Sequence, residues 1–242
     1  MALLAIETAT DRMGVALVDD GRLLASYELL AERPHASELP QAVTRVLESG
    51  GVTLAQLDGL AVDIGPGSFT GLRIGLAFVK ALAFASKRPV VGVSSLEVLA
   101  NGVPPTDAAI CPLLDAKRRQ VYAAVFRAVD GSVQRDADDV LVPIDELPRL
   151  IPSGPILFIG DGADLYRAQL IAAAGARARF APPELWWPNA GTLGRLALAR
   201  LRRGEQDDPK TLLPRYLYSM DCTIRPSSRS PGAPRKTPAG QA

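Results

Sequence analysis

The sequence predicts an α/β protein of two lobes that repeat one order of elements. In each half a strand ends in an acidic residue, Glu7 or Asp115, and a second strand leads through an Asp-Gly hairpin turn into a third. Each half then continues with a strand, a glycine-containing turn and a helix. Because this order occurs twice, we interpret the chain as the product of an internal duplication. The proline-containing segment 103–106 is the expected boundary between the lobes.

The first lobe is expected to span residues 1–104. Its Asp20-Gly21 pair is a strong hairpin signal. Ser37 is a good helix cap, and the apolar side chains that follow it at helical spacing predict an amphipathic helix that Gly50-Gly51 ends. The expected elements are strands 2–7, 13–18, 22–30, 59–64 and 89–93, a short helix at 53–56, and longer helices at 37–50, 71–85 and from Ser94 to Asn101.

The second lobe is expected to span residues 105–222, and the sequence leaves open whether its last helix returns to the first lobe. Residues 223–242 are rich in Pro, Ser, Gly, Arg and Lys without apolar periodicity, which predicts a disordered basic tail. The expected elements of this lobe are strands 109–114, 120–128 and 155–159, a third meander strand after Asp130-Gly131, and helices 163–174 and 190–203.

The amino-acid composition argues against several classes of protein. The 242 residues carry a formal net charge of +1, which gives no overall electrostatic footprint for nucleic acid. One histidine and two distant cysteines make a zinc site unexpected. The first ten residues lack a basic leader, and Lys80 interrupts the longest apolar run, so we expect no signal peptide and no membrane span. The expected location is the cytoplasm.

The stretch Asp63–Gly75 contains a glycine-rich turn between a strand and a helix. Such a turn either binds an anion at the helix N-terminus or lets backbone pack closely. The lysine and hydroxyl spacing of a P-loop is missing, so a Walker site is excluded. Ser68 or Thr70 is expected to cap the helix. Arg73 is expected to pair with an acid or to contact a partner. We favour the close-packing interpretation.

Helix 71–85 is apolar almost all round, which is more than one buried face requires. Either its own lobe covers the helix on two sides, or a partner covers the second side. The small residues Gly71, Gly75, Ala77 and Ala81 would permit close helix approach. Sequence periodicity alone does not decide between these alternatives.

Two lobes that each open with a meander are typical of the actin-like ATPases (ASKHA fold). In that fold two hairpin turns hold the nucleotide phosphates and a glycine turn holds adenosine, so ATP or ADP with Mg²⁺ is the implied ligand of the interlobe cleft. Each phosphate turn here is only half complete: the first lacks glycine, and the second places Lys117 and Arg118 where glycine is wanted. An ATPase or kinase is therefore the alternative function. The candidate nucleotide residues are Glu7, Thr8, Thr10, Asp115, Lys117, Arg118, Gly160 and Gly162.

Several motifs closely resemble the bacterial TsaB family, also called YeaZ, over residues 1–218. They are Ile6-Glu7-Thr8-Ala9-Thr10, His35-Ala36-Ser37-Glu38-Leu39-Pro40, Gly65–Gly75, Asp115-Ala116-Lys117-Arg118, Gly160-Asp161-Gly162-Ala163 and Pro214-Arg215-Tyr216-Leu217. The resemblance implies a catalytically degenerate paralogue of TsaD, the transferase of tRNA N6-threonylcarbamoyladenosine synthesis at adenosine 37. TsaD-like proteins carry a His-x-x-x-His metal pair. Here the residue four positions after His35 is Leu39, so no metal site is expected.

The resemblance further implies a non-catalytic dimerisation subunit. Its partners would be a TsaD-like transferase and a TsaE-like ATPase, with tRNA reached through the complex and a homodimer in isolation. The resemblance favours a partner interface on helix 71–85, with helix 37–48 alongside. The expected interface residues are Ser37, Leu39, Val43, Leu47, Leu72, Arg73, Leu76, Val79, Lys80 and Ala83.

Two further interpretations are weaker. The basic turn Lys117-Arg118-Arg119 could contact tRNA or nucleotide phosphate, but a solvated turn is the commoner use of such a run. A protease is excluded because His35 is the only histidine and no Gly-x-Ser-x-Gly elbow is present.

Overall fold

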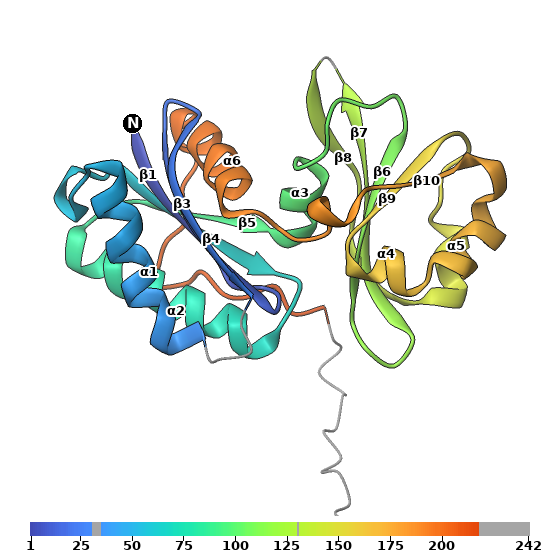
Figure 1. Ribbon diagram of the computed structural model, residues 1–242, viewed down its shortest axis with the longest axis horizontal. Coiled ribbons are helices and arrows are strands. Elements are labelled where there is room, and N and C mark those ends of the chain that lie inside the picture. The colour runs from blue at the N-terminus through green and yellow to red at the C-terminus, as the bar shows by residue number, and fades with distance from the viewer. Residues whose placement is uncertain (31–34, 130, 218–242) are drawn as a thin grey trace, which may run out of the picture.

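The computed structural model describes residues 1–30, 35–129 and 131–217. They form two lobes side by side, each built on a five-stranded sheet with helices packed against it (Figure 1). The predicted tail at 223–242 lies outside the described residues.

The first sheet has the strand order β3-β2-β1-β4-β5. The predicted meander is confirmed: β1 pairs antiparallel with β2, and β2 with β3. Asp20 and Gly21 both adopt positive φ angles (47° and 80°), as a type I′ hairpin turn requires. Two further strands extend the sheet in parallel on the other side of β1. The strands are β1 (Ala2–Glu7), β2 (Arg12–Asp19), β3 (Arg22–Leu30), β4 (Gly59–Gly65) and β5 (Val90–Ser94).

Helices cover both faces of the first sheet. Helices α1 (His35–Gly50) and α2 (Phe69–Ser86) lie on one face, and α6 (Ala190–Arg202) lies on the other (Figure 1). The last long helix therefore returns to the first lobe. Among the described residues, α2 is the one helix long and apolar enough to cross a membrane by length and composition alone, and its buried face packs into the first-lobe core. The 3-10 helix η1 (Leu54–Gln56) follows α1 and carries the predicted capping box of Thr53 and Gln56.

The second sheet has the order β10-β9-β6-β7-β8, which repeats the order of the first sheet and confirms the duplication. The predicted single helix at 163–174 is wrong, because Tyr166 leaves helical geometry (φ −110°, ψ 22°) and divides it in two. The elements are β6 (Ala109–Asp115), β7 (Gln120–Val129), β8 (Ser132–Pro143), β9 (Ile156–Ile159), β10 (Ala178–Phe180), α4 (Asp161–Leu165), α5 (Arg167–Ala174), and the 3-10 helices η2 (Ile144–Arg149), η3 (Gly175–Arg177) and η4 (Pro183–Leu185).

An ionic cluster at Asp139 of β8 joins the two lobes. Its fully buried carboxylate accepts hydrogen bonds from the Ser94 hydroxyl at the end of β5 (2.8 Å) and from Arg215 near the C-terminus (2.7 Å). Arg135 of β8 binds the other carboxylate oxygen. Ser94 and Arg215 come from two other segments, so this carboxylate of β8 links the second sheet to the first sheet and to the end of the described chain.

The C-terminal segment 212–217 runs from the first lobe to the second. Leu212 packs against the first-lobe core, while Leu217 packs against the apolar cluster that α3 (Ser95–Ala100) shares with the second sheet. The backbone N–H of Arg215 donates to Ile64 of β4 at 2.7 Å. The segment therefore contributes to the structure of both lobes and of their junction.

Candidate functional site: the interlobe cleft and the outer face of α2

The glycines before and within α2 allow the helix to approach the turn after β1. A Cβ on Gly71 would lie 2.0 Å from the Thr8 carbonyl oxygen, and one on Gly67 would lie 2.2 Å from the Ala9 oxygen. The Thr8 hydroxyl donates a hydrogen bond to the Gly71 carbonyl at 2.9 Å, and Ser68 caps the helix by accepting from Gly71 N–H. The close-packing interpretation of this stretch is confirmed, and its backbone is committed to the lobe's own structure.

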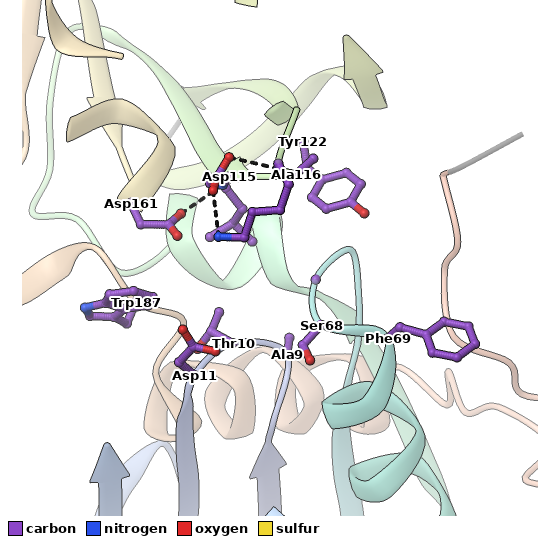
Figure 2. A pocket seen from close by; sticks show the side chains of 13 residues that line it. Ala9, Thr10, Asp11, Ser68, Phe69, Asp115, Ala116, Tyr122, Asp161 and Trp187 are labelled. Carbon is purple, nitrogen blue, oxygen red and sulfur yellow. Dashed lines mark hydrogen bonds and ion pairs between the residues drawn. The ribbon is translucent and has the colours of Figure 1, made fainter. Parts of the chain in front are cut away.

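A cavity of about 340 Å³ lies between the lobes. Figure 2 shows Thr10, Asp11 and Ser68 of the first lobe facing Asp115 and Asp161 of the second. The full set of lining residues is Ala9, Thr10, Asp11, Gly67, Ser68, Phe69, Leu114, Asp115, Ala116, Lys117, Tyr122, Asp161 and Trp187.

Acidic side chains dominate the charge of this cleft. Its aspartates are Asp11, Asp115 and Asp161, and Lys117 is the cation among its lining residues. The Lys117 ammonium bonds the Asp115 carboxylate at 2.8 Å, which raises the pKa of the lysine. Asp161 accepts from the Asp115 and Gly162 N–H groups, while burial raises its pKa. The lysine is already neutralised, so the cleft offers a polyphosphate more repulsion than attraction.

The predicted nucleotide residues do not assemble into one site. Thr10, Asp115 and Lys117 line the cavity, whereas the others do not. Glu7, the expected magnesium-organising group, is enclosed at 1% exposure. A Cβ on Gly160 would lie 2.1 Å from the Leu113 carbonyl, so this glycine serves packing against β6 and not a ligand. Thr8, Arg118 and Gly162 are likewise absent from the lining. The residues present do not fit ATP with Mg²⁺. Asp161 belongs to the predicted adenosine turn and Ser68 to the glycine-rich turn, whereas Asp11, Tyr122 and Trp187 were not predicted from the sequence as cleft residues.

Two buried carboxylates lie side by side beneath the cleft. Glu7 ends β1 and Asp63 lies at the neighbouring position of β4. Each has one buried oxygen that finds no hydrogen-bond partner within the described part of the chain. Burial, followed by the charge of Asp63, holds the pKa of Glu7 well above its ordinary value. Burial raises the pKa of Asp63 to about 7, although Ser95 and Gly65 donate to its other oxygen.

We expect this pair to destabilise the fold as pH rises. The folded pKa of Asp63 exceeds its unfolded value of about 4, so between about pH 4 and 7 the folded state holds a proton that the unfolded state has released. The stability contribution of the pair is therefore present at pH 4 and declines as pH rises through 7. In urea unfolding across this range, Asp63→Asn should remove part of the decline. The exposed Asp138→Asn variant is the control, and an equal pH slope in wild type and Asp63→Asn would contradict the assignment.

The basic turn between β6 and β7 has unusual backbone geometry. Lys117, Arg118 and Arg119 all adopt left-handed φ angles (63°, 53° and 59°), each costing about 1–2 kcal/mol for a non-glycine residue. Arg119 bonds Asp145 at 3.1 Å. Arg118 is exposed and makes no hydrogen bond or ion pair among the described residues.

The predicted interface residues divide into two groups. Ser37 and Arg73 are exposed, and Leu47 and Lys80 are partly exposed. The other six are buried in the first lobe, so they cannot contact a partner in this conformation, and their prediction as contact residues is corrected. The side of α2 that faces its own sheet therefore accounts for only part of the apolar residues of the helix. The buried residues are Leu39, Val43, Leu72, Leu76, Val79 and Ala83.

The outer face of α2 contains side chains that the prediction missed. Phe69 is 55% exposed and Phe84 is 74% exposed. Ala77 and Ala81 lie exposed between them. Helical spacing could have found these positions once Leu72, Leu76, Val79 and Ala83 were taken as the inward stripe. We define the docking face as Phe69, Arg73, Ala77, Lys80, Ala81, Phe84 and Lys87.

Arg73 is held at one end of the docking face by aromatic rings. Its guanidinium carbon lies 3.6 Å from the centroid of the Phe69 ring. Its Nε donates to the Tyr216 hydroxyl at 2.9 Å, and the two rings lie 5.3 Å apart. The expected acidic partner for Arg73 is not found among the described residues. The C-terminal segment thus fixes the orientation of an exposed cation.

Two lobes of the same meander-first topology, facing each other across a cleft, define the class of actin-like folds, and this chain has that fold. The family described as TsaD: tRNA N6-adenosine threonylcarbamoyltransferase matches residues 29–224. The tRNA threonylcarbamoyladenosine biosynthesis protein TsaB of Bacillus subtilis (strain 168) is 29% identical over 219 residues, which is 90% of this chain and 94% of that protein.

A solved structure, YeaZ from Pseudomonas aeruginosa, has a TM-score of 0.78 at 31% identity, covering 89% of this chain and 99% of that one. The tRNA N6-adenosine threonylcarbamoyltransferase of Trichlorobacter lovleyi is 37% identical over 113 residues, which is 40% of this chain and 33% of that enzyme. The chain belongs to the TsaB (YeaZ) family and takes part in tRNA threonylcarbamoyladenosine biosynthesis.

Proposed function

We propose that this chain is a non-catalytic subunit that binds and activates a TsaD-type transferase through the docking face. The observation that carries the proposal is the outer side of α2, where two phenylalanines remain exposed with small residues between them. Exposed apolar faces of this kind mark protein–protein contacts. Alanines at the centre would let a partner helix approach closely, while the aromatic side chains would anchor its ends.

The cleft supports a non-catalytic role. Lys117 is paired with Asp115, and Glu7, the acid expected to bind magnesium, is buried. The charged side chains that line the cleft are mostly aspartates. In residues 1–30, 35–129 and 131–217, no group of three or more His, Cys, Asp or Glu side chains could hold a metal ion. The position that would carry the second histidine of a transferase pair is the buried Leu39. These features fit a paralogue of the transferase that retains its fold and lacks its catalytic activity.

The proposal extends to a wider assembly, which the family resemblance suggests. A TsaE-like ATPase would join the two subunits, and tRNA would reach this chain through the complex, in the cytoplasm where tRNA is modified. In isolation the exposed docking face would drive weak self-association.

Charge substitution at the centre of the docking face tests the proposal. Leu76 and Val79 are unsuitable because they are buried, and a charge there would unfold the lobe. Ala77→Glu and Ala81→Glu keep the helix and place a longer, charged side chain at the centre of the contact, where it blocks close approach of a partner helix and reduces the positive charge of the face. We expect affinity for the transferase of the same organism to fall at least about 30-fold, or ~2 kcal/mol, by calorimetry.

Ala172→Glu is the matched control, because Ala172 is an exposed alanine in α5 of the second lobe. It should bind as wild type does, and circular dichroism should show all three variants folded. Equal affinity of Ala77→Glu, Ala81→Glu and Ala172→Glu would refute the docking face. The mass of the co-expressed complex by light scattering gives its stoichiometry.

A further inference from the structure

The docking face carries a regular line of cations. Arg73, Lys80 and Lys87 follow one another at seven-residue spacing, which is close to two helical turns. Arg73 and Lys80 therefore lie along one side of the helix, with Ala77 between them. Lys87 is the left-handed C-cap residue that follows the helix (φ 57°), and its ammonium returns to this side over the Phe84 ring. No Asp or Glu occurs from Phe69 to Arg88, so the helix itself supplies no balancing charge.

These three cations have no acidic partner among the described residues. Arg73 contacts the rings of Phe69 and Tyr216, and the Lys87 ammonium lies 4.4 Å from the centroid of the Phe84 ring. Cations of this lobe differ in their partners: Arg200 of α6 bonds both carboxylate oxygens of Glu97 at 2.6 Å, whereas Arg45 of α1 lies over the Tyr27 ring. The cations of the docking face remain available to a carboxylate that comes from outside the chain.

A second copy of this chain is a poor electrostatic match for the line of cations on the docking face. If two copies paired α2 against α2 with the helices antiparallel, a two-fold axis at Lys80 would bring Lys80 against Lys80 and Arg73 against Lys87. If the helices were parallel, each cation would face its own equivalent. Like charges meet in both arrangements, and such pairs oppose association most strongly at low ionic strength.

We infer that the docking face selects a partner helix that carries acidic side chains at about seven-residue spacing, in preference to a second copy of this chain. The inference rests on the proposed function, because it names the chemistry of the surface that the transferase presents to α2. The apolar side chains of the docking face provide the binding affinity. The three cations determine the register of the partner helix and discriminate between partners.

Salt dependence of the complex tests the inference. Affinity for the transferase of the same organism should fall as NaCl rises from 50 to 500 mM, whereas self-association of this chain should strengthen. The combined variant Arg73→Gln, Lys80→Gln, Lys87→Gln should bind the transferase roughly tenfold more weakly at 50 mM and show a flatter salt slope. Its self-association should be stronger than that of wild type.

The matched control replaces three exposed cations outside α2, in the variant Arg22→Gln, Arg149→Gln, Lys210→Gln, and should retain the wild-type affinity and slope. Carbodiimide, which joins lysine to carboxylate, should link Lys80 and Lys87 to Asp or Glu residues on one transferase helix, as read by mass spectrometry.

The outcomes separate the two proposals. A complex that Ala77→Glu disrupts, but that neither salt nor the triple glutamine variant weakens, overturns the charge inference and leaves the proposed function standing. Lysine cross-links between two copies of this chain in place of the transferase also overturn it. If wild type forms no complex at any salt concentration, the proposed function fails and the inference fails with it.

Discussion

Asp139→Ala is expected to lower the free energy of unfolding by about 3–5 kcal/mol in urea titrations. The carboxylate is fully buried and accepts hydrogen bonds from Ser94 and Arg215 while it binds Arg135. Removing it leaves two guanidinium groups facing each other at the junction of the lobes without their shared counter-charge. The repulsion between Arg135 and Arg215 should add to the loss of the hydrogen bonds.

Asp136→Ala is the control on the same strand. Asp136 pairs with Arg127 at the surface, where both side chains are more than a third exposed, so the variant should lose less than about 1 kcal/mol. Similar losses for the two variants would show that Asp139 does not join the lobes. Arg215→Ala should reproduce part of the Asp139 effect, because it removes one donor and leaves Arg135 in place.

Gly71→Ala is expected to destabilise the protein by about 3 kcal/mol and to weaken transferase binding at the same time. The added methyl carbon would lie 2.0 Å from the Thr8 carbonyl oxygen, and a backbone atom cannot move away as a flexible side chain can. The start of α2 must therefore shift, and the hydrogen bond from the Thr8 hydroxyl to Gly71 would break. Because Phe69 and Arg73 lie in the same turns, the end of the docking face would shift as well.

Thr70→Ala is the matched control in the same helical turn. Thr70 is exposed, and its replacement should change stability by no more than about 0.5 kcal/mol. Thermal unfolding and calorimetric binding of both variants would check the pair. Wild-type stability of Gly71→Ala would show that the first lobe accommodates the shift, contrary to the packing described above.

Much of the fold could be predicted because its signals are local. Asp20-Gly21 specifies a turn by its own backbone preference, and apolar runs such as 59–64 identify buried strands without reference to distant residues. Because the same order of strands, turn and helix occurs in both halves, the two-lobed architecture could be predicted as well. The break at Tyr166 was missed because the apolar spacing continues across it, and the three-residue strand β10 is too short to leave a periodic signal.

The docking face was harder to predict, because exposure depends on which side of α2 the sheet covers. Leu76 and Phe84 are both large and apolar, but one is 5% exposed and the other 74%. The sequence places both residues on one helix, but it does not show which of them faces the sheet and which faces solvent. The nucleotide residues failed for a related reason: Glu7 follows the expected strand, but the depth at which it lies depends on β4 and on Asp63.

The return of α6 to the first sheet has a consequence for the order in which the protein can fold during synthesis. The second-lobe core draws its buried residues from Ala109–Ala174, one continuous stretch of chain. The first lobe, although it is made first, lacks the cover for one face of its sheet until Leu193, Ala197 and Leu198 leave the ribosome. Its contacts with Leu212 and with the Arg215 backbone come later still. One face of the first sheet is thus covered only after the Ala109–Ala174 core of the second lobe has been translated, and the contacts of 212–217 then complete both lobes together.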